Sequence, residues 1–274
     1  MFGRIIALSA VCAGMLFSAL ASAQQITVAD WNIRSFEKGV GNNQILQDDI
    51  TEYVDLLKGL DADIITLNEF ETGTSRMGRE RAAELASRLG MFAYFIKSYP
   101  KDSGYYGNVI LSRYPMVGNG SYLLPYQNYK GEGNYQFNND EMSEIWGADQ
   151  RSVGYADILV PVSDTESRVI RVVCTHLDHL IGPEGRRKQF EEVAKFPSLA
   201  NPPYPALLLG DLNTYSTSDT MDPVKNIGDH LYKDWVDHLL GFPKGKWSAV
   251  SEDTIDSGSL SDHNAIKVVL RLND

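Results

Sequence analysis

Residues 206–213 read ALLLGDLN, an apolar run that ends in a short polar tag. Other apolar runs of the chain end in the same way, and such runs indicate buried strands. Ligands of α/β folds bind just outside the carboxyl ends of these strands, so we expect the tags to converge at one edge of the fold. The other tags are Trp31-Asn32, Asn68-Glu69, Thr175-His176 and Ser261-Asp262-His263.

The side chains of the tags suit one type of chemistry. Their carboxylate and amide oxygens are ligands for a divalent cation, and their imidazoles can hold a phosphate or transfer a proton. No serine or cysteine nucleophile stands in an obvious catalytic setting. The tags therefore predict metal-assisted hydrolysis of a phosphoester.

Each tag taken alone also has a structural interpretation. Glu69 ends an apolar strand, where a carboxylate is costly unless it is exposed or compensated by a cation. It is therefore a metal ligand, an exposed strand-end acid or a helix cap. In extended geometry Asp211 and Asn213 point the same way, which suits an acid beside a water and an amide beside a phosphoryl oxygen. The alternative for this pair is an Asx turn at the strand end.

The hydrophobic periodicity of the chain predicts one α/β domain, a sheet sandwich flanked by helices. Residues 125–149 lack this periodicity, so they form either a functional loop over the active face or a surface insertion without a role. We expect helices at 45–60, 79–89 and 183–196, and strands at 26–33, 64–67, 92–96, 109–112, 152–160, 168–174, 206–209 and 265–270.

The N-terminal 23 residues predict a signal peptide. Arg4 gives a positive start, an apolar stretch follows, and Ala21-Ser22-Ala23 forms an A-x-A cleavage site. The alternative is a membrane anchor, but the apolar stretch is short and ends in small residues. We therefore expect a catalytic domain over residues 24–274 that is exported, to the periplasm or outside the cell. Cys174 is the only cysteine of that part, so it cannot form an intrachain disulfide.

The formal net charge of the chain is −11. Contacts to a polyanion need clustered Lys and Arg, so this charge weighs against nonspecific affinity for nucleic acid. It does not exclude a nuclease, because bound cations can neutralise a local acidic site.

Six segments of the chain carry a family resemblance. They are TVADWNIRSF, DIITLNEF, YGNVILSRYP, VVCTHLDH, LLLGDLNT and LSDHNAIKV, and they run from residue 26 to 270. In this order they resemble the endonuclease/exonuclease/phosphatase superfamily, which includes deoxyribonuclease I, abasic-site endonucleases, sphingomyelinases, inositol-polyphosphate phosphatases and deadenylases. The resemblance implies a four-layer sandwich, in which two mixed β-sheets pack face to face and helices cover their outer faces.

The resemblance also implies a role for each tag residue. It makes Glu69 and Asn32 ligands of the metal ion and places Asp262 near that ion. It makes Asp211 the base that activates water and Asn213 a hydrogen-bond donor to the transition state. The remaining implied roles concern the phosphate: His176 and His263 contact it, and Asn108 orients either Asp211 or the phosphate.

One feature departs from the family pattern. Family members carry an Ile-Asp-Tyr strand upstream of the Ser-Asp-His tag, and its Asp orients the last histidine. Here Ile255-Asp256 lacks the aromatic residue and is separated from the tag by a very short spacer. Asp256 is the expected partner of His263, with Glu252 and Asp253 as alternatives.

These observations together predict an exported phosphoester hydrolase that depends on Mg²⁺ or Mn²⁺. A Mg²⁺-dependent nuclease on DNA or RNA and a catalytically silent domain that binds a ligand or partner are the alternatives. The expected partner is a phosphoester substrate, either a small molecule, a lipid head group or a nucleic acid. We expect a monomer with no stable protein partner and no transmembrane segment in residues 24–274.

Overall fold

The computed structural model of the protein describes residues 25–39, 45–46, 48–77, 80–127, 133–134, 149–162 and 166–273. The expected signal peptide and most of the expected loop at 125–149 lie outside these residues. Among the described residues, no helix has both the length and the apolar character needed to cross a bilayer.

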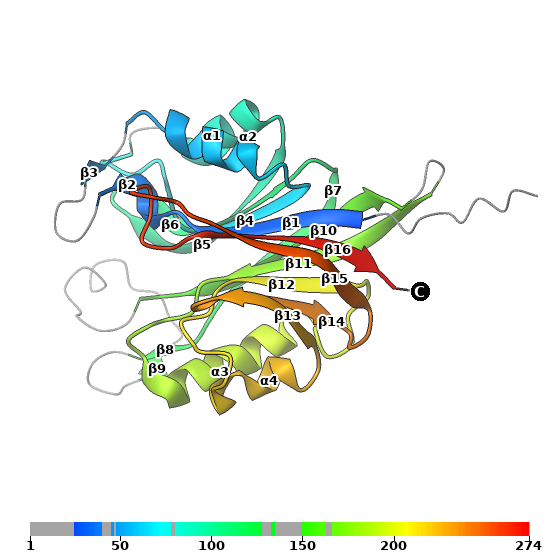
Figure 1. Ribbon diagram of the computed structural model, residues 1–274. Helices are drawn as coiled ribbons and strands as arrows, with labels where there is room; N and C mark the ends of the chain where they lie inside the picture. The colour runs from blue at the N-terminus through cyan, green and yellow to red at the C-terminus, as the bar shows by residue number, and fades with distance from the viewer. Residues whose placement is uncertain are drawn as a thin grey trace, which may run out of the picture.

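Two six-stranded sheets pack face to face between two layers of helices (Figure 1). In the first sheet the order is β15 (Trp247–Ile255), β16 (Ala265–Leu272), β1 (Gln25–Asn32), β4 (Ile64–Thr72), β6 (Gly104–Ser112), β5 (Phe92–Lys101). In the second it is β13 (Asp229–Asp234), β14 (Asp237–Phe242), β12 (Ala206–Asp211), β11 (Ser167–Thr175), β10 (Ser152–Pro161), β7 (Met116–Leu123).

Both sheets are mixed, because β1 pairs with β4 and β11 pairs with β12 in parallel, while the other neighbours are antiparallel. The predicted four-layer sandwich of two mixed sheets is therefore confirmed. Helices α1 (Thr51–Gly59) and α2 (Arg81–Leu89) cover the first sheet, and α3 (Gly182–Lys195) and α4 (Asp222–Lys225) cover the second (Figure 1).

The alternation of side chains along the strands builds three apolar layers. In β4, Ile64 joins the core between the sheets, and the next residue, Ile65, joins the layer under α1 and α2. The third layer lies between the second sheet and its helices and contains Leu208, Leu240 and Phe190. Strands that are buried on both faces read as continuous apolar runs, which is why the sequence revealed them.

The expected helices agree with the structure except at one end. Gly90 ends α2 in the left-handed conformation, and Pro183 lies in the first turn of α3. The expected helix at 45–60 is wrong over its first residues, since α1 begins at Thr51. Before it, β3 (Ile45–Leu46) pairs with β2 (Glu37–Lys38).

Four strands of the main sheets were not predicted from the sequence: β7, β13, β14 and β15. These strands are polar or glycine-containing, and β7, β13 and β15 are largely or partly exposed, so they lack a long apolar run. These missed strands matter for the site. The turn between β13 and β14 carries Trp235, β14 begins with Asp237, and both residues contact His263.

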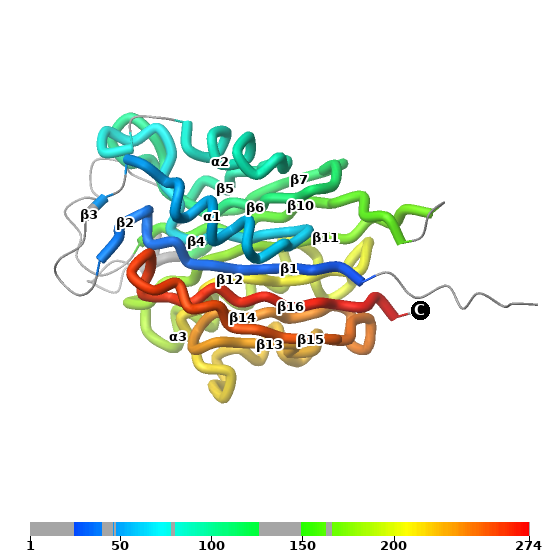
Figure 2. The backbone as a smooth tube through the Cα atoms, turned by 45° about the horizontal axis from the view of Figure 1, so that its top comes forward, coloured from blue at the N-terminus to red at the C-terminus, as the bar shows by residue number. Residues whose placement is uncertain are grey.

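The carboxyl ends of β1 and β4 lie at one end of the sandwich, where β1 leads towards β2 (Figure 2). The carboxyl ends of β11 and β12 reach the same end of the second sheet. Asp211, the last residue of β12, contacts Asn32 and Asn68, and Thr175, the last residue of β11, accepts from Asn68. This edge carries the polar tags.

Candidate active site

The first contact of the site joins the two sheets through one amide. Asn32 Nδ2 lies 3.0 Å from Glu69 Oε1 and 3.1 Å from Asp211 Oδ2 and donates to both carboxylates. Asn32 Oδ1 accepts from the backbone N of Arg34 at 3.0 Å. In this arrangement Asn32 fixes the two carboxylates in place and directs its nitrogen, rather than its oxygen, towards them.

A β-bulge aims Glu69 into the site. The pairing of β4 with β6 shifts register between Leu67 and Phe70, and Glu69 has a φ of 55°. Bulges of this kind redirect side chains next to active sites, and positive φ in a non-glycine residue is backbone strain that occurs at functional positions. The carboxylate of Glu69 thereby leaves the alternation of its strand.

Gly210 allows the tag at residues 210–213 to cross closely over β11. Its φ is 146°, and a Cβ there would stand 1.8 Å from the carbonyl oxygen of Thr175, so only glycine fits. Asp211 Oδ1 then accepts from the backbone N of Asn213 at 2.9 Å, which is the Asx turn considered as an alternative. Asn213 has a φ of 46°, so the expectation of extended geometry at this residue is wrong.

Asn68 connects three strands behind these carboxylates. Its Oδ1 accepts from the backbone N of Asp211 at 2.8 Å, and its Nδ2 donates to Asn108 Oδ1 at 2.9 Å and to the Thr175 carbonyl at 3.2 Å. Asn108 Nδ2 is buried and has no partner in the described structure. A buried donor without a partner is costly, so its presence beside the carboxylates calls for a functional explanation.

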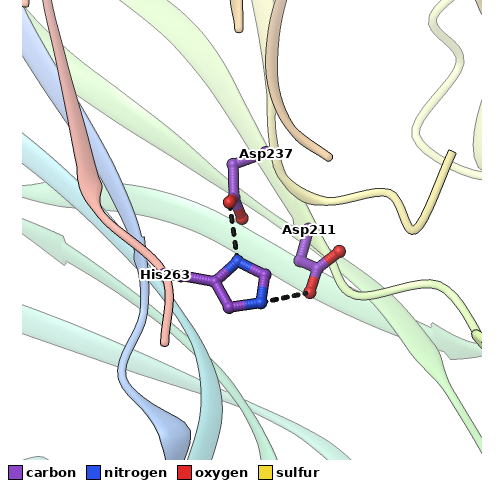
Figure 3. Close-up of side chains that lie close together, drawn as sticks. All are labelled: Asp211, Asp237 and His263. Carbon is purple, nitrogen blue, oxygen red and sulfur yellow. Dashed lines mark hydrogen bonds and ion pairs between the residues drawn. The ribbon is translucent and has the colours of Figure 1, made fainter. Parts of the chain in front are cut away.

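The ring of His263 lies between two carboxylates, as Figure 3 shows. Its Nδ1 is 2.7 Å from Asp237 Oδ2 and its Nε2 is 3.7 Å from Asp211 Oδ2. Burial lowers the pKa of His263, but the hydrogen bond to Asp237 and the charges of Asp237, Asp211 and Asp262 outweigh it and raise the pKa to about 9. The ring is therefore an imidazolium at neutral pH.

The structure makes Asp237, and not Asp256, the acid that orients His263. Asp256 is exposed, and its Oδ1 accepts from the backbone N of Gly258 at 2.8 Å. The alternatives Glu252 and Asp253 are exposed on β15. The sequence did contain a signal for Asp237. Val236-Asp237-His238 differs from the family's Ile-Asp-Tyr only in having Val in place of Ile and His in place of Tyr.

The second histidine has a different environment. Arg151 Nη1 lies 3.0 Å from His176 Nδ1, and because a guanidinium can only donate, this nitrogen is the acceptor and Nε2 carries the proton. His176 Nε2 lies 3.3 Å from Asp211 Oδ2 and donates to it. The Asn213 amide nitrogen, 3.0 Å from Nε2, is also a donor, so it bonds not to this N–H but to the Leu177 carbonyl at 2.8 Å. Burial, followed by the charge of Arg151, holds the pKa of His176 well below its usual value. The ring is a neutral donor.

The electrostatics of the acids suit a cation near Glu69. Burial raises the pKa of Glu69, and the hydrogen bond from Asn32 and the charge of Arg151 lower it in part. Glu69 and Asp211 share one amide, and in the described part of the chain no Lys or Arg forms an ion pair with Glu69. Glu69 thus lacks a cationic partner of its own in this part of the chain and lies beside a second carboxylate, an arrangement that fits a divalent cation whose charge stabilises the ionised forms.

Asp211, Asp237 and His263 are a second group that could hold a metal ion, since their ligand atoms lie within 4.8 Å of one another. However, Nδ1 of His263 is engaged with Asp237, so this trio resembles an oriented acid–histidine pair more than a ligand set.

Asp262 lies apart from the expected cluster. Its side chain is 55% exposed and forms an ion pair of 3.6 Å with Arg34 Nε. Within the residues that the structure describes, it contacts neither Glu69 nor Asp211, and it acts on His263 through its charge. The structure thus brings together seven of the expected residues and leaves out Asp256 and Asp262. The seven are Asn32, Glu69, Asn108, His176, Asp211, Asn213 and His263.

Comparison with known proteins agrees with this geometry. The family model described as "Endonuclease/Exonuclease/phosphatase family" matches residues 31–263. None of the curated proteins matches the sequence.

Solved structures of the same fold are similar over nearly the whole chain. An endonuclease/exonuclease/phosphatase from Beutenbergia cavernae is 19% identical, with 91% of this chain and 72% of that chain covered and a TM-score of 0.64. A mannosyl-6-phosphatase from Bacteroides thetaiotaomicron is 17% identical, with 89% and 99% covered and a TM-score of 0.61. The catalytic domain of human Nocturnin is 16% identical, with 91% and 94% covered and a TM-score of 0.61. At these identities the similarity shows the fold.

Proposed function

The chain belongs to the endonuclease/exonuclease/phosphatase family, and from this premise we propose that it is an exported phosphoester hydrolase that uses Mg²⁺ or Mn²⁺. Members of the family are typically phosphoester hydrolases. The observation that carries the proposal is the position of Asp211, whose Oδ2 faces the Asn32 amide and the Nε2 atoms of His176 and His263.

Asp211 is suited to accept a proton from the attacking water. Burial raises the pKa of Asp211, while the charge of His263 and the hydrogen bonds from Asn213 and Asn32 lower it in part. A carboxylate with a raised pKa is a stronger base than an exposed one, and its orientation is fixed by two hydrogen bonds. Proton transfer therefore needs little rearrangement of the protein.

The two histidines flank the place where a phosphoryl group would lie against Asp211, His263 as a charged donor and His176 as a neutral one. The buried Nδ2 of Asn108 is a further donor without a partner among the described residues, whereas Nδ2 of Asn213 already donates to the Leu177 carbonyl at 2.8 Å. Preorganised donors stabilise the charge that develops on phosphoryl oxygens. A divalent cation held by Glu69, with Asn32 fixing its carboxylate, would supply Lewis-acid stabilisation of that charge.

We favour a small phosphoester over nucleic acid as the substrate. The net charge of −11 gives the protein no general attraction for a polyanion. The similarity in fold to a mannosyl-6-phosphatase supports a phosphomonoester, and the nucleases that the family description names leave nuclease activity as the second candidate.

The test is a panel of phosphoesters assayed with Mg²⁺, with Mn²⁺ and after chelation with EDTA. We expect hydrolysis of at least one phosphomonoester, loss of activity with EDTA, and recovery on adding the metal. Glu69→Gln should lose activity, whereas Glu184→Gln, at an acid whose side chain is 87% exposed on α3, should not. Full activity in EDTA would exclude the metal requirement, and hydrolysis of plasmid DNA alone would favour the nuclease.

Export rests on the A-x-A site at residues 21–23. N-terminal sequencing of the protein from its native cells should give a chain that begins at Gln24, found outside the cytoplasm. An intact Met1 in the cytoplasmic fraction would contradict it.

A further inference from the structure

Two exposed aromatic side chains border the catalytic His263. The ring centroid of Trp235 lies 5.0 Å from that of His263, with an angle of 40° between the planes. Trp235 Nε1 is 3.5 Å from the hydroxyl of Tyr215. Trp235 is 51% exposed and Tyr215 is 63% exposed, so both present apolar surface to solvent next to the site. We name these two residues the aromatic shelf.

The backbone holds Trp235 in a strained conformation. It lies in the tight turn between β13 and β14, which is closed by the pair of Asp234 and Asp237, and its φ is 48°. Such turn positions favour Gly, Asn or Asp, and a large side chain there is costly. Since half of the ring is exposed, burial offsets only part of this cost. Strain that is retained at such a place points to a role in binding.

We propose that the aromatic shelf binds the sugar ring of a phosphoester in which that ring is joined to the phosphate directly or through one exocyclic carbon. This inference rests on the proposed hydrolase function. The apolar face of a sugar ring packs on aromatic rings, and its hydroxyls need polar neighbours. Asn264 and Asp234 are polar side chains beside the shelf, and Asn264 Nδ2 donates to Asp234 Oδ2 at 3.1 Å. Asn264 directly follows His263 in the sequence, and Asp234 directly precedes Trp235.

The closeness of the shelf to His263 decides which ring can stack. The ring of Trp235 packs directly on the ring of His263. A group that stacks on Trp235 while His263 holds the phosphate must therefore lie near the phosphorus atom. In a nucleotide the base is separated from the phosphate by the whole ribose, so the base would lie beyond the shelf. Glycerol and choline esters carry no ring to stack.

The test compares substrates that share a phosphate but differ in the ring. We would measure kcat/KM for hexose 6-phosphates and for glycerol 3-phosphate, with 5′-AMP and the base-free ribose 5-phosphate as a third arm, in the wild type and in Trp235→Ala and Tyr215→Ala. We expect the wild type to prefer at least one hexose 6-phosphate over glycerol 3-phosphate. Each variant should reduce this ratio about tenfold, the size of one lost stacking contact. The ratio cancels any loss that both substrates share.

Phe92→Ala is the matched control, because Phe92 is also 51% exposed but lies at the start of β5, paired with Ser112. It should leave the ratio unchanged. Equal losses on both substrates in Trp235→Ala would mean that Trp235 only positions His263, and a preference for 5′-AMP over ribose 5-phosphate that is lost in the variants would assign the shelf to a base. Either result would overturn the proposal.

A binding measurement separates this proposal from the hydrolase function. Calorimetric titration of hexose 6-phosphate and glycerol 3-phosphate in EDTA reports on the shelf without turnover. If no phosphoester is hydrolysed but hexose 6-phosphate binds more tightly and Trp235→Ala removes the difference, the shelf stands and the hydrolase proposal fails. If hydrolysis occurs and no ring preference exists in binding or turnover, the hydrolase stands and the shelf proposal fails.

Discussion

His176 and His263 both direct Nε2 towards Asp211, yet their surroundings give them opposite charge states. Arg151 occupies Nδ1 of His176 and, together with burial, holds its pKa well below the usual value. Asp237 occupies Nδ1 of His263, and the nearby carboxylates raise its pKa to about 9 against the effect of burial. The residue behind each ring, rather than the ring itself, therefore decides whether it serves as a neutral donor or as a cation.

The largest effect is expected from the acid that both rings face. Asp211→Asn keeps the shape of the side chain but cannot accept the proton of a water. Loss of a general base reduces turnover by about a hundred- to ten-thousand-fold. The measurement is kcat on the phosphomonoester identified by the substrate panel, with circular dichroism to verify folding. Turnover within a few-fold of the wild type in a folded variant would reduce Asp211 to a structural turn residue.

The second effect should separate the two histidines. In Asp237→Asn the His263 ring loses its charged partner, so its pKa should fall from about 9 towards the ordinary value of 6.5, while the titration of His176 should shift less, since only the charge of His263 couples the two rings. We expect the alkaline limit of kcat/KM to shift to lower pH and kcat at pH 8 to fall about tenfold or more. Histidine NMR titrations and the pH profile measure both. An unchanged profile would show that Asp237 does not set the charge of His263.

The same substitution has a consequence for stability. The raised pKa of His263 means that its protonation stabilises the fold fully below the unfolded pKa of 6.5, and that this contribution is lost as pH rises through about 9. Above that pH the buried Asp237 carboxylate, whose pKa burial raises to about 6, is left ionised without a charged partner. The difference in unfolding free energy between wild type and Asp237→Asn should therefore be larger at pH 6 than at pH 10.

The predictability of the two histidines from sequence also differs. His176 immediately follows β11, an apolar strand that the sequence shows directly, and Asp211 ends β12. Glu69 follows the apolar run of β4 at the bulge inside that strand, which continues to Thr72. Asp237 begins β14, which follows a polar, half-exposed strand and a tight turn. Local pattern reveals strands that are buried on both faces, whereas a hairpin at the edge of a sheet carries a weak signal.

The contacts that decide the charge states could not be obtained from local pattern at all. Arg151 and His176 are 25 residues apart, and Asp237 and His263 are 26 residues apart. The bulge at Glu69 and the turn at Asn213 likewise depend on how the two sheets pack. The sequence identified the residue types of the site and the edge where they meet. It did not identify which acid stands behind which ring.

The smallest effect is expected at Asp256, the acid that the sequence pointed to as the partner of His263. Its carboxylate is exposed and accepts from the backbone N of Gly258, so its removal leaves the Asp237–His263 contact intact. Asp256→Ala should change kcat/KM by no more than about twofold, as for other exposed substitutions, and should leave the alkaline limit of the pH profile in place. Measured beside Asp237→Asn under the same conditions, it separates the acid that touches the ring from one that is merely near it in sequence. If Asp256→Ala shifted the pH profile as far as Asp237→Asn does, the charge of His263 would be set by the loop before it, and the contrast with His176 would have a different physical origin.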